Sequence, residues 1–317
     1  MCIFFAIINI KPDSNRIRKD TTMKKTVFEG IATALITPLD ANGINYTQFG
    51  ALIDWQIEQG IDALVICGTT GENATLHDSE HKAAIEFAVK RAAGRIPIIA
   101  GTGSNDVAHA VMMTEFASSV GADAVLTVTP YYNKCTQNGL VQSFTTIADH
   151  SAVPVILYNV PSRTGVQILP KTYEILADHP NIVAFKEANG DISKIAETMA
   201  LVGDKLTLYS GNDDQIVPLL SLGGKGCISV LSNVLPAQTR EICTRFFNGD
   251  VAGSCELQLR YQKLIAALFS EVNPIPVKAA MAAMGFCENY LRLPLTPMEE
   301  ANYQNLLRRM REQGVRV

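Results

Sequence analysis

Eight short runs of β-forming residues recur along this chain, and segments with helical periodicity or loops separate them. Strands that alternate with helices pair in parallel, because neighbouring strands of the same direction need a long crossover connection. The runs are apolar almost throughout, as expected when both faces of a sheet are covered. Eight such units favour a closed (β/α)8 TIM barrel over an open sheet. The predicted strands span residues 30–37, 63–67, 97–100, 124–129, 154–158, 182–186, 206–210 and 226–230.

Helical patterns continue after the eighth run, over residues 236–247, 251–269, 274–284 and 297–313. The first would close the barrel, and no Gly/Ser linker or charge block separates the others from it. We therefore assign residues 23–248 to the barrel and residues 249–317 to a C-terminal helical extension packed on it. Within the barrel, residues 79–93 carry an amphipathic pattern typical of a helix, with Ser79 as the expected N-cap.

The first 22 residues form a separate segment. Ten apolar residues precede a charged stretch, and they are too few for a membrane span and lack the positive region of a signal peptide. Met23, which two lysines follow, is an alternative start. We expect residues 1–22 to be a disordered extension.

Composition narrows the class of protein. The chain has 317 residues, of which 47% are hydrophobic, enough for a large buried core. A net charge of -4 leaves no basic face for nucleic acid or anionic lipid. The seven cysteines form no C-x-x-C pair, so we expect reduced thiols in a cytoplasmic protein. The five histidines form no metal-binding motif, and we expect no metal; Asp213, beside a second aspartate, reads better as a helix cap than as a magnesium ligand.

Lys186 stands in the middle of an apolar run, residues 181–188, where charge is expensive. Because taking an ammonium group out of water costs free energy, burial favours the neutral amine. A neutral amine attacks carbonyl carbon, and its usual product with a keto acid is an imine. The alternative is a structural lysine whose head pairs with Glu187 or reaches water at the sheet edge.

Polar side chains cluster after the predicted strands, at the end of a barrel where chemistry takes place. An imine-forming amine needs a proton relay, and Tyr158, Thr70 and Tyr132 carry suitable hydroxyls. The hydroxyls of Thr69 and Thr70 could hold the carboxylate of a keto acid. Arg163 could clamp a second carboxylate with two hydrogen bonds. Taken singly, each has a structural alternative: a core tyrosine with a wet tip, a generic tight turn, a surface arginine.

Five motifs in order along residues 28–309 resemble the 4-hydroxy-tetrahydrodipicolinate synthase family, formerly called dihydrodipicolinate synthases. They are Gly68-Thr-Thr-Gly-Glu72, Thr129-Pro-Tyr-Tyr-Asn133, Tyr158-Asn-Val-Pro-Ser-Arg-Thr-Gly165, Phe185-Lys-Glu-Ala188 and Asn273-Pro-Ile-Pro-Val-Lys278. The resemblance implies a lyase of diaminopimelate and lysine biosynthesis that condenses pyruvate with aspartate 4-semialdehyde. It implies a covalent imine on Lys186 and no other cofactor.

The resemblance also implies residue roles. Thr70, Tyr132 and Tyr158 would form the proton relay, with Tyr132 lent across a dimer interface, and Arg163 would bind the semialdehyde's carboxylate. The backbone of Gly211 and Ile228 would line the pyruvate pocket. The expected assembly is a cytoplasmic homotetramer built as a dimer of dimers, with no nucleic-acid or membrane partner.

Two other functions account for some of these features. N-acetylneuraminate lyase resembles this chain in barrel, lysine and Gly-Thr-Thr-Gly turn, but its members lack an arginine five residues after the catalytic tyrosine, where this chain has Arg163. A barrel that only senses a keto acid would not need the relay of Thr70, Tyr132 and Tyr158.

Family members that lysine inhibits bind it at the dimer interface. Five residues here match that site wholly or nearly: Asn73, Ala74, His81, Asn105 and Tyr131. Two depart from it, because His109 stands where those members have glutamate and Asp78 stands where they have histidine. Histidine pairs less well than glutamate with the ammonium of lysine. We therefore expect weak or absent lysine inhibition.

Overall fold

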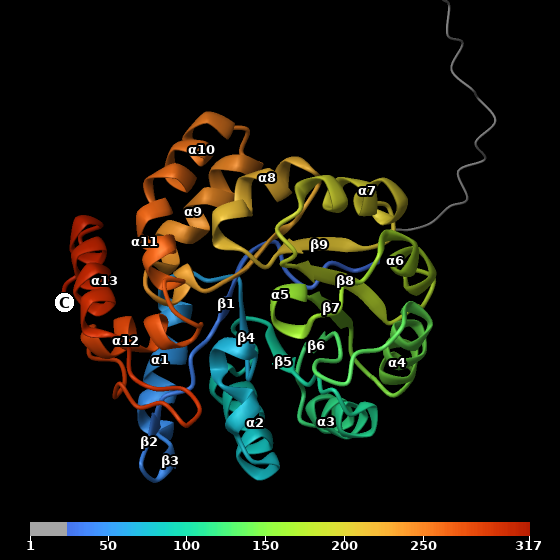
Figure 1. The fold of residues 1–317 in the computed structure, drawn as a ribbon, viewed down its shortest axis with the longest axis horizontal. Coiled ribbons are helices and arrows are strands. Elements are labelled where there is room, and N and C mark those ends of the chain that lie inside the picture. The colour runs from blue at the N-terminus through green and yellow to red at the C-terminus, as the bar shows by residue number, and fades with distance from the viewer. Residues whose placement is uncertain (1–23) are drawn as a thin grey trace, which may run out of the picture.

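A computed structural model of the chain describes residues 24–317, and eight parallel strands close into a barrel with helices around it (Figure 1). The strands are β1 (Gly30–Ala34), β4 (Ala63–Ile66), β5 (Ile98–Gly101), β6 (Ala124–Val128), β7 (Val155–Asn159), β8 (Ile182–Glu187), β9 (Thr207–Ser210) and β10 (Gly226–Ser229). Each pairs with the next in this order, and β10 pairs with β1. The predicted (β/α)8 barrel is confirmed, and the largest error in a strand end is at β1, which stops at Ala34 instead of residue 37.

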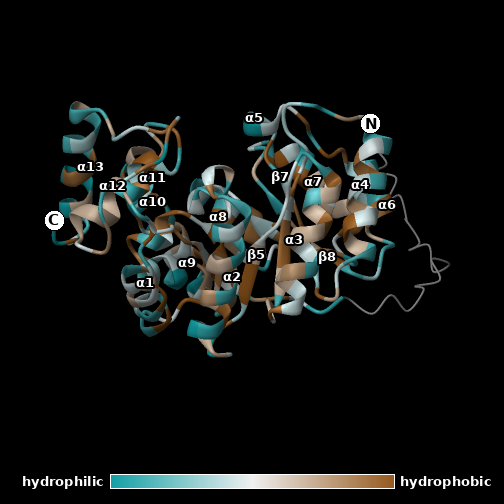
Figure 2. Cartoon of the chain, turned by 90° about the horizontal axis from the view of Figure 1, so that it is seen from below, coloured by the Kyte–Doolittle hydropathy of each residue, from teal (hydrophilic) through white to brown (hydrophobic). Residues whose placement is uncertain are grey.

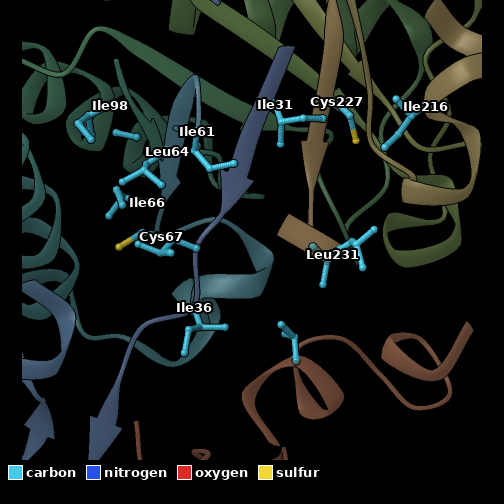
Figure 3. Close-up of a cluster of buried hydrophobic side chains, with 14 of the residues drawn as sticks. Ile31, Ile36, Ile61, Leu64, Ile66, Cys67, Ile98, Ile216, Cys227 and Leu231 are labelled. Atoms are coloured by element: carbon cyan, nitrogen blue, oxygen red, sulfur yellow. The ribbon is translucent and has the colours of Figure 1, made fainter. Parts of the chain in front are cut away.

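Alternate residues of each strand pack into two separate hydrophobic clusters. The inner cluster, which includes Ala32, Ala184 and Ile228, fills the barrel. The outer cluster lies between strands and helices, and Figure 3 shows Ile31 and Cys227 from two neighbouring strands within it. Figure 2 shows hydrophobic residues concentrated on the strands. Because both faces of every strand are covered, the strands read as apolar runs without polar alternation.

The helices that surround the barrel are α1 (Tyr46–Glu58), α2 (Asp78–Ala92), α3 (Val107–Ser119), α4 (Gln137–Asp149), α5 (Pro161–Thr164), α6 (Pro170–Leu176), α7 (Ile192–Val202), α8 (Ile216–Ser221) and α9 (Pro236–Phe247). The prediction of Ser79 as the N-cap of α2 is wrong. The cap is the extended residue His77, and its backbone N–H donates to the Glu80 carboxylate at 3.1 Å. Ser79 therefore lies inside the first turn.

The C-terminal extension contains α10 (Val251–Arg260), α11 (Gln262–Leu268), α12 (Ile275–Ala283) and α13 (Glu300–Glu312), and α12 and α13 lie beside the barrel (Figures 1 and 2). The single helix predicted over residues 251–269 is interrupted at Tyr261. A short hairpin of β2 (Leu39–Asp40) and β3 (Gly43–Ile44) was not predicted, because two residues are too few to show a strand pattern.

No helix within residues 24–317 combines the length and the hydropathy that a bilayer crossing requires. The predicted extension at residues 1–22 lies outside the described residues. The predicted division after residue 248 falls in the turn between α9 and α10.

Candidate active site

Lys186 projects into the barrel. On β8 it follows Ala184 of the inner cluster by two residues, whereas Phe185 between them belongs to the outer cluster and packs on Tyr173 of α6. Successive side chains of a strand point to opposite faces, so Lys186 faces inward and Glu187 faces outward. Lys186 is 6% exposed, so the side chain is buried, as predicted. Pairing with Glu187 is therefore not the explanation for this lysine.

The amine of Lys186 contacts Tyr158. Strands β7 and β8 pair these residues in register, and Nζ lies 4.3 Å from the centre of the phenol ring. Gly211, after β9, leaves room for the lysine: a Cβ there would lie 3.1 Å from Lys186 Cε and 2.8 Å from the Cβ of Ala188. A glycine at this position therefore allows the lysine stem to pass the loop.

A cavity of about 170 Å³ opens at the C-terminal end of the barrel. The structure brings six predicted site residues to its walls: Thr69, Thr70, Tyr158, Arg163, Lys186 and Gly211. They come from four different strand ends, so the barrel assembles the site from distant parts of the chain. An amine, hydroxyls and a guanidinium around a small cavity suit a keto acid that carries a carboxylate.

Two predicted site residues do not line this cavity. Tyr132 is 92% exposed and has a left-handed backbone with φ of 69°. Ile228 is buried in the inner cluster on β10. A single chain therefore presents Tyr132 to the outside and keeps Ile228 out of the cavity wall.

The extension supplies two cavity residues that the sequence analysis did not assign to the site, Phe269 and Asn273. Asn273 Nδ2 donates a hydrogen bond to Thr70 Oγ1 at 3.0 Å, and Arg163 Nη2 donates to the main-chain oxygen of Asn273 at 3.2 Å. The motif that begins at Asn273 was the only feature of the sequence that pointed to this contact. The general properties of a (β/α)8 barrel do not predict that a C-terminal extension reaches the mouth of the barrel.

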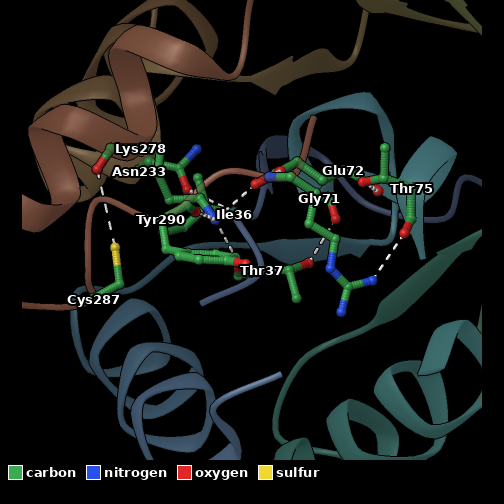
Figure 4. A network of polar contacts seen from close by, with 10 residues as sticks. Ile36, Thr37, Gly71, Glu72, Thr75, Asn233, Lys278, Cys287 and Tyr290 are labelled. Carbon is green, nitrogen blue, oxygen red and sulfur yellow. Dashed lines mark hydrogen bonds and ion pairs between the residues drawn. The ribbon is translucent and has the colours of Figure 1, made fainter. Parts of the chain in front are cut away.

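A buried ion pair joins the extension to the Gly-Thr-Thr-Gly loop (Figure 4). Lys278 Nζ of α12 lies 2.7 Å from Glu72 Oε1, and both side chains are inaccessible to solvent. Lys278 also donates to the main-chain oxygen of Thr37 at 2.6 Å. Each charge is compensated inside the protein, so the pair fixes α12 against the loop that carries Thr70.

Glu187 forms a second polar centre, on the outer side of β8. Its carboxylate accepts hydrogen bonds from Asn159 Nδ2 at 3.0 Å, from Tyr173 Oη at 3.2 Å and from the Asn189 N–H at 2.9 Å. Burial raises the pKa of Glu187 from 4.5 to about 7, against the opposing effect of these donors. The cluster links β7, α6 and the loop after β8 immediately behind Lys186.

This raised pKa makes the stability of the fold depend on pH. A carboxyl whose pKa is higher in the folded protein than in the unfolded chain favours folding only while it is protonated, so its contribution is lost as pH rises from about 4.5 to 7. A shift of this size corresponds to about 3 kcal/mol. We expect that in Glu187→Gln the free energy of unfolding no longer contains this decrease with rising pH. Urea unfolding of both proteins between pH 5 and pH 8 would measure the difference. Parallel pH profiles for the two proteins would contradict it.

The residues of the expected lysine site lie on the loop before α2, on α2 and α3, and on neighbouring loops. The two departures from the pattern pair with each other, because His109 Nε2 lies 2.9 Å from Asp78 Oδ1. This hydrogen bond lowers the pKa of Asp78. His81 is buried and contacts the main-chain oxygen of Gly101 at 2.8 Å, and burial lowers its pKa. The remaining predicted members are Asn73 and Ala74 in a 3₁₀ turn, Asn105 before α3, and Tyr131, which is exposed after β6.

The prediction of Asp213 as a helix N-cap is wrong, because the 3₁₀ turn that contains it is capped by Asn212 and the helix α8 that follows is capped by Gln215. Asp213 Oδ2 accepts from the backbone N–H groups of Val230 and Leu231 at 3.0 and 2.9 Å, at the start of a 3₁₀ turn after β10. Across residues 24–317, His, Cys, Asp and Glu side chains form no group of three or more that could hold a metal ion.

The sequence and the structure were compared with known proteins, and the matches described here belong to one family. Residues 27–313 match the dihydrodipicolinate synthetase family. A 4-hydroxy-tetrahydrodipicolinate synthase from Acetivibrio thermocellus is 51% identical over 293 residues, which cover 92% of this chain and 100% of the relative. The crystal structure of dihydrodipicolinate synthase from Aquifex aeolicus has a TM-score of 0.90 and 43% identity, covering 92% and 99% of the two chains. The chloride-inhibited enzyme from Acinetobacter baumannii, crystallised with pyruvate, has a TM-score of 0.89 and 40% identity, covering 92% and 100%.

Proposed function

This chain belongs to the dihydrodipicolinate synthetase family, and we propose that it carries out the family's reaction through an imine between pyruvate and Lys186. It is a lyase of lysine and diaminopimelate biosynthesis that condenses pyruvate with aspartate 4-semialdehyde to 4-hydroxy-tetrahydrodipicolinate. The observation that carries the proposed mechanism is the buried Lys186, which lines the cavity with its amine against Tyr158. The imine requires no further cofactor.

The first stage joins pyruvate to the enzyme. The Thr69 and Thr70 hydroxyls hold the carboxylate of pyruvate, and Lys186 Nζ attacks the ketone carbon. An N–C bond forms, a C–O bond breaks, and one water leaves as the carbinolamine becomes the imine. Tyr158 and Thr70 pass the protons that this departure needs.

The second stage makes the new carbon–carbon bond. Loss of a methyl proton converts the imine to an enamine, whose carbon attacks the aldehyde carbon of the semialdehyde. The C=O double bond becomes a single bond, its oxygen takes up one proton to form a hydroxyl, and the imine with Lys186 re-forms. The Arg163 guanidinium at the cavity binds the semialdehyde's carboxylate with charge-assisted hydrogen bonds. The amine of the semialdehyde then displaces Lys186 and closes the ring.

The active assembly contains more than one chain. The exposure of Tyr132 and its left-handed backbone support a role in which the side chain completes the relay in a neighbouring subunit. We propose a cytoplasmic homotetramer arranged as a dimer of dimers.

A coupled assay tests the proposed reaction. Purified protein with pyruvate should consume aspartate 4-semialdehyde and leave a sugar aldehyde, the partner of the N-acetylneuraminate lyase type of reaction, untouched. Consumption of the sugar aldehyde would favour that alternative, and binding of pyruvate without turnover of either partner would favour a sensor.

The paired Asp78 and His109 predict little response to lysine. Their mutual hydrogen bond occupies the position where inhibited members carry a free carboxylate for the lysine ammonium. We expect the steady-state rate to stay nearly unchanged at sub-millimolar lysine. The double variant Asp78→His, His109→Glu restores the residue types of the inhibited members and should increase sensitivity. Strong inhibition of the unaltered protein in this concentration range would refute the expectation.

A further inference from the structure

Asn273 links the C-terminal extension to two residues of the active site, Thr70 and Arg163. It lies between α11 and α12, is 6% exposed and lines the cavity that contains Lys186. Its side-chain Nδ2 donates to Thr70 Oγ1 at 3.0 Å, and its main-chain oxygen accepts from Arg163 Nη2 at 3.2 Å. One residue of the extension thus contacts both a relay residue and the arginine of the site.

The direction of the bond to Thr70 has a chemical consequence. An amide nitrogen only donates, whereas a hydroxyl has one proton and two acceptor positions. Because Thr70 Oγ1 accepts from Asn273, its own proton is free to point elsewhere. Within residues 24–317 Thr70 Oγ1 has no other hydrogen-bond partner, and Thr70 lines the cavity. Its proton is therefore available to a group inside the cavity.

We propose that Asn273 is a positioning residue that orients the Thr70 hydroxyl as a donor toward the cavity. This inference rests on the proposed function, in which Thr70 belongs to the proton relay. Asn273 also holds the guanidinium of Arg163 near the same wall through its main-chain oxygen. The extension in this way takes part in the chemistry of the barrel.

Asn273 is held between two chain segments. The bond from Nδ2 to Thr70 is the hydrogen bond that the amide makes in the described part of the chain, where its buried Oδ1 has no partner. Five residues later, Lys278 forms the buried ion pair with Glu72, two residues beyond Thr70. The ion pair therefore holds the segment that carries Asn273 against the loop that carries Thr70.

A double-mutant cycle of Thr70→Val and Asn273→Ala, measured as kcat with saturating pyruvate and semialdehyde, tests the inference. Loss of a proton-relay group lowers kcat about 100-fold or more, and we expect that loss of its orientation alone lowers kcat about tenfold. Asn273→Ala should therefore lower kcat about tenfold in the unaltered protein and less than about twofold in the Thr70→Val background. Independent losses that multiply in the double variant would overturn the inference. If Thr70→Val alone keeps the normal rate, the relay of the proposed function fails first.

Asn273→Asp is the second variant, because it keeps the shape of the side chain. Its ionised carboxylate only accepts, so the Thr70 proton would turn toward it and away from the cavity. We expect a larger loss of kcat than in Asn273→Ala, increasing with pH as the introduced carboxyl ionises, with kcat measured at temperatures well below the melting temperature of the variant at each pH. A kcat that stays normal up to the highest pH at which the variant is folded would overturn the inference. If Asn273→Ala does not fold, this variant and its pH profile decide the question.

Discussion

The Lys186→Ala variant is expected to fold normally and to lose at least about a thousandfold in kcat. The amine is the only group of the protein that forms a covalent bond with pyruvate in the proposed mechanism, and no hydroxyl of the cavity can replace it. The fold should persist because, within residues 24–317, Lys186 Nζ makes no hydrogen bond or ion pair, and it lies 4.3 Å from the centre of the Tyr158 ring. Removing it also removes the cost of burying an amine.

The control is Lys186→Met, which keeps the length and packing of the side chain without the nucleophile. Both variants should retain the melting temperature and circular dichroism of the unaltered protein, and both should be inactive. Near-normal turnover in either variant would mean that another lysine forms the imine.

The Lys278→Met variant is expected to be destabilised by about 3–5 kcal/mol, the usual cost of leaving one charge of a buried pair without its partner. Glu72 is inaccessible to solvent, and its cation Lys278 is supplied 2.7 Å away by α12. The substitution also leaves the main-chain oxygen of Thr37 without its donor. Unfolding in urea, with the change in midpoint and slope compared between proteins, gives the magnitude.

The matched control for this prediction is the double variant Glu72→Gln, Lys278→Met, which removes both charges. It should regain most of the lost stability, because no uncompensated charge then remains inside the protein. A single variant as stable as the unaltered protein, or a double variant no more stable than the single one, would show that the ion pair does not anchor the extension.

Local sequence patterns were sufficient for the barrel. Each strand is an apolar run that ends where polar or glycine-rich loop residues begin, so its position could be read directly from the sequence. The same patterns placed Lys186 in the sixth strand, whereas the face on which it lies follows from the structure, in which Ala184 two residues earlier belongs to the inner cluster. The helix start at His77 was missed because Ser79 is a good capping residue that happens to lie two positions further on.

The parts of the site that sequence could not provide come from tertiary packing. Asn273 and Phe269 reach the cavity only because the extension folds back over the barrel mouth, and no local periodicity encodes that contact. Tyr132 was predicted to act across a dimer interface. The structure contains one chain, so this role stays a prediction. Ile228 was expected to line the pocket through its backbone; its side chain lies in the inner cluster on β10, and the role of its backbone stays a prediction.

The most direct test of the proposed mechanism is to incubate the protein with pyruvate, reduce it with borohydride and locate the modified peptide by mass spectrometry. The mechanism predicts a reduced pyruvate adduct on Lys186 and none in the Lys186→Ala variant. An adduct on a different lysine, or no adduct under conditions in which the enzyme turns over, would contradict it.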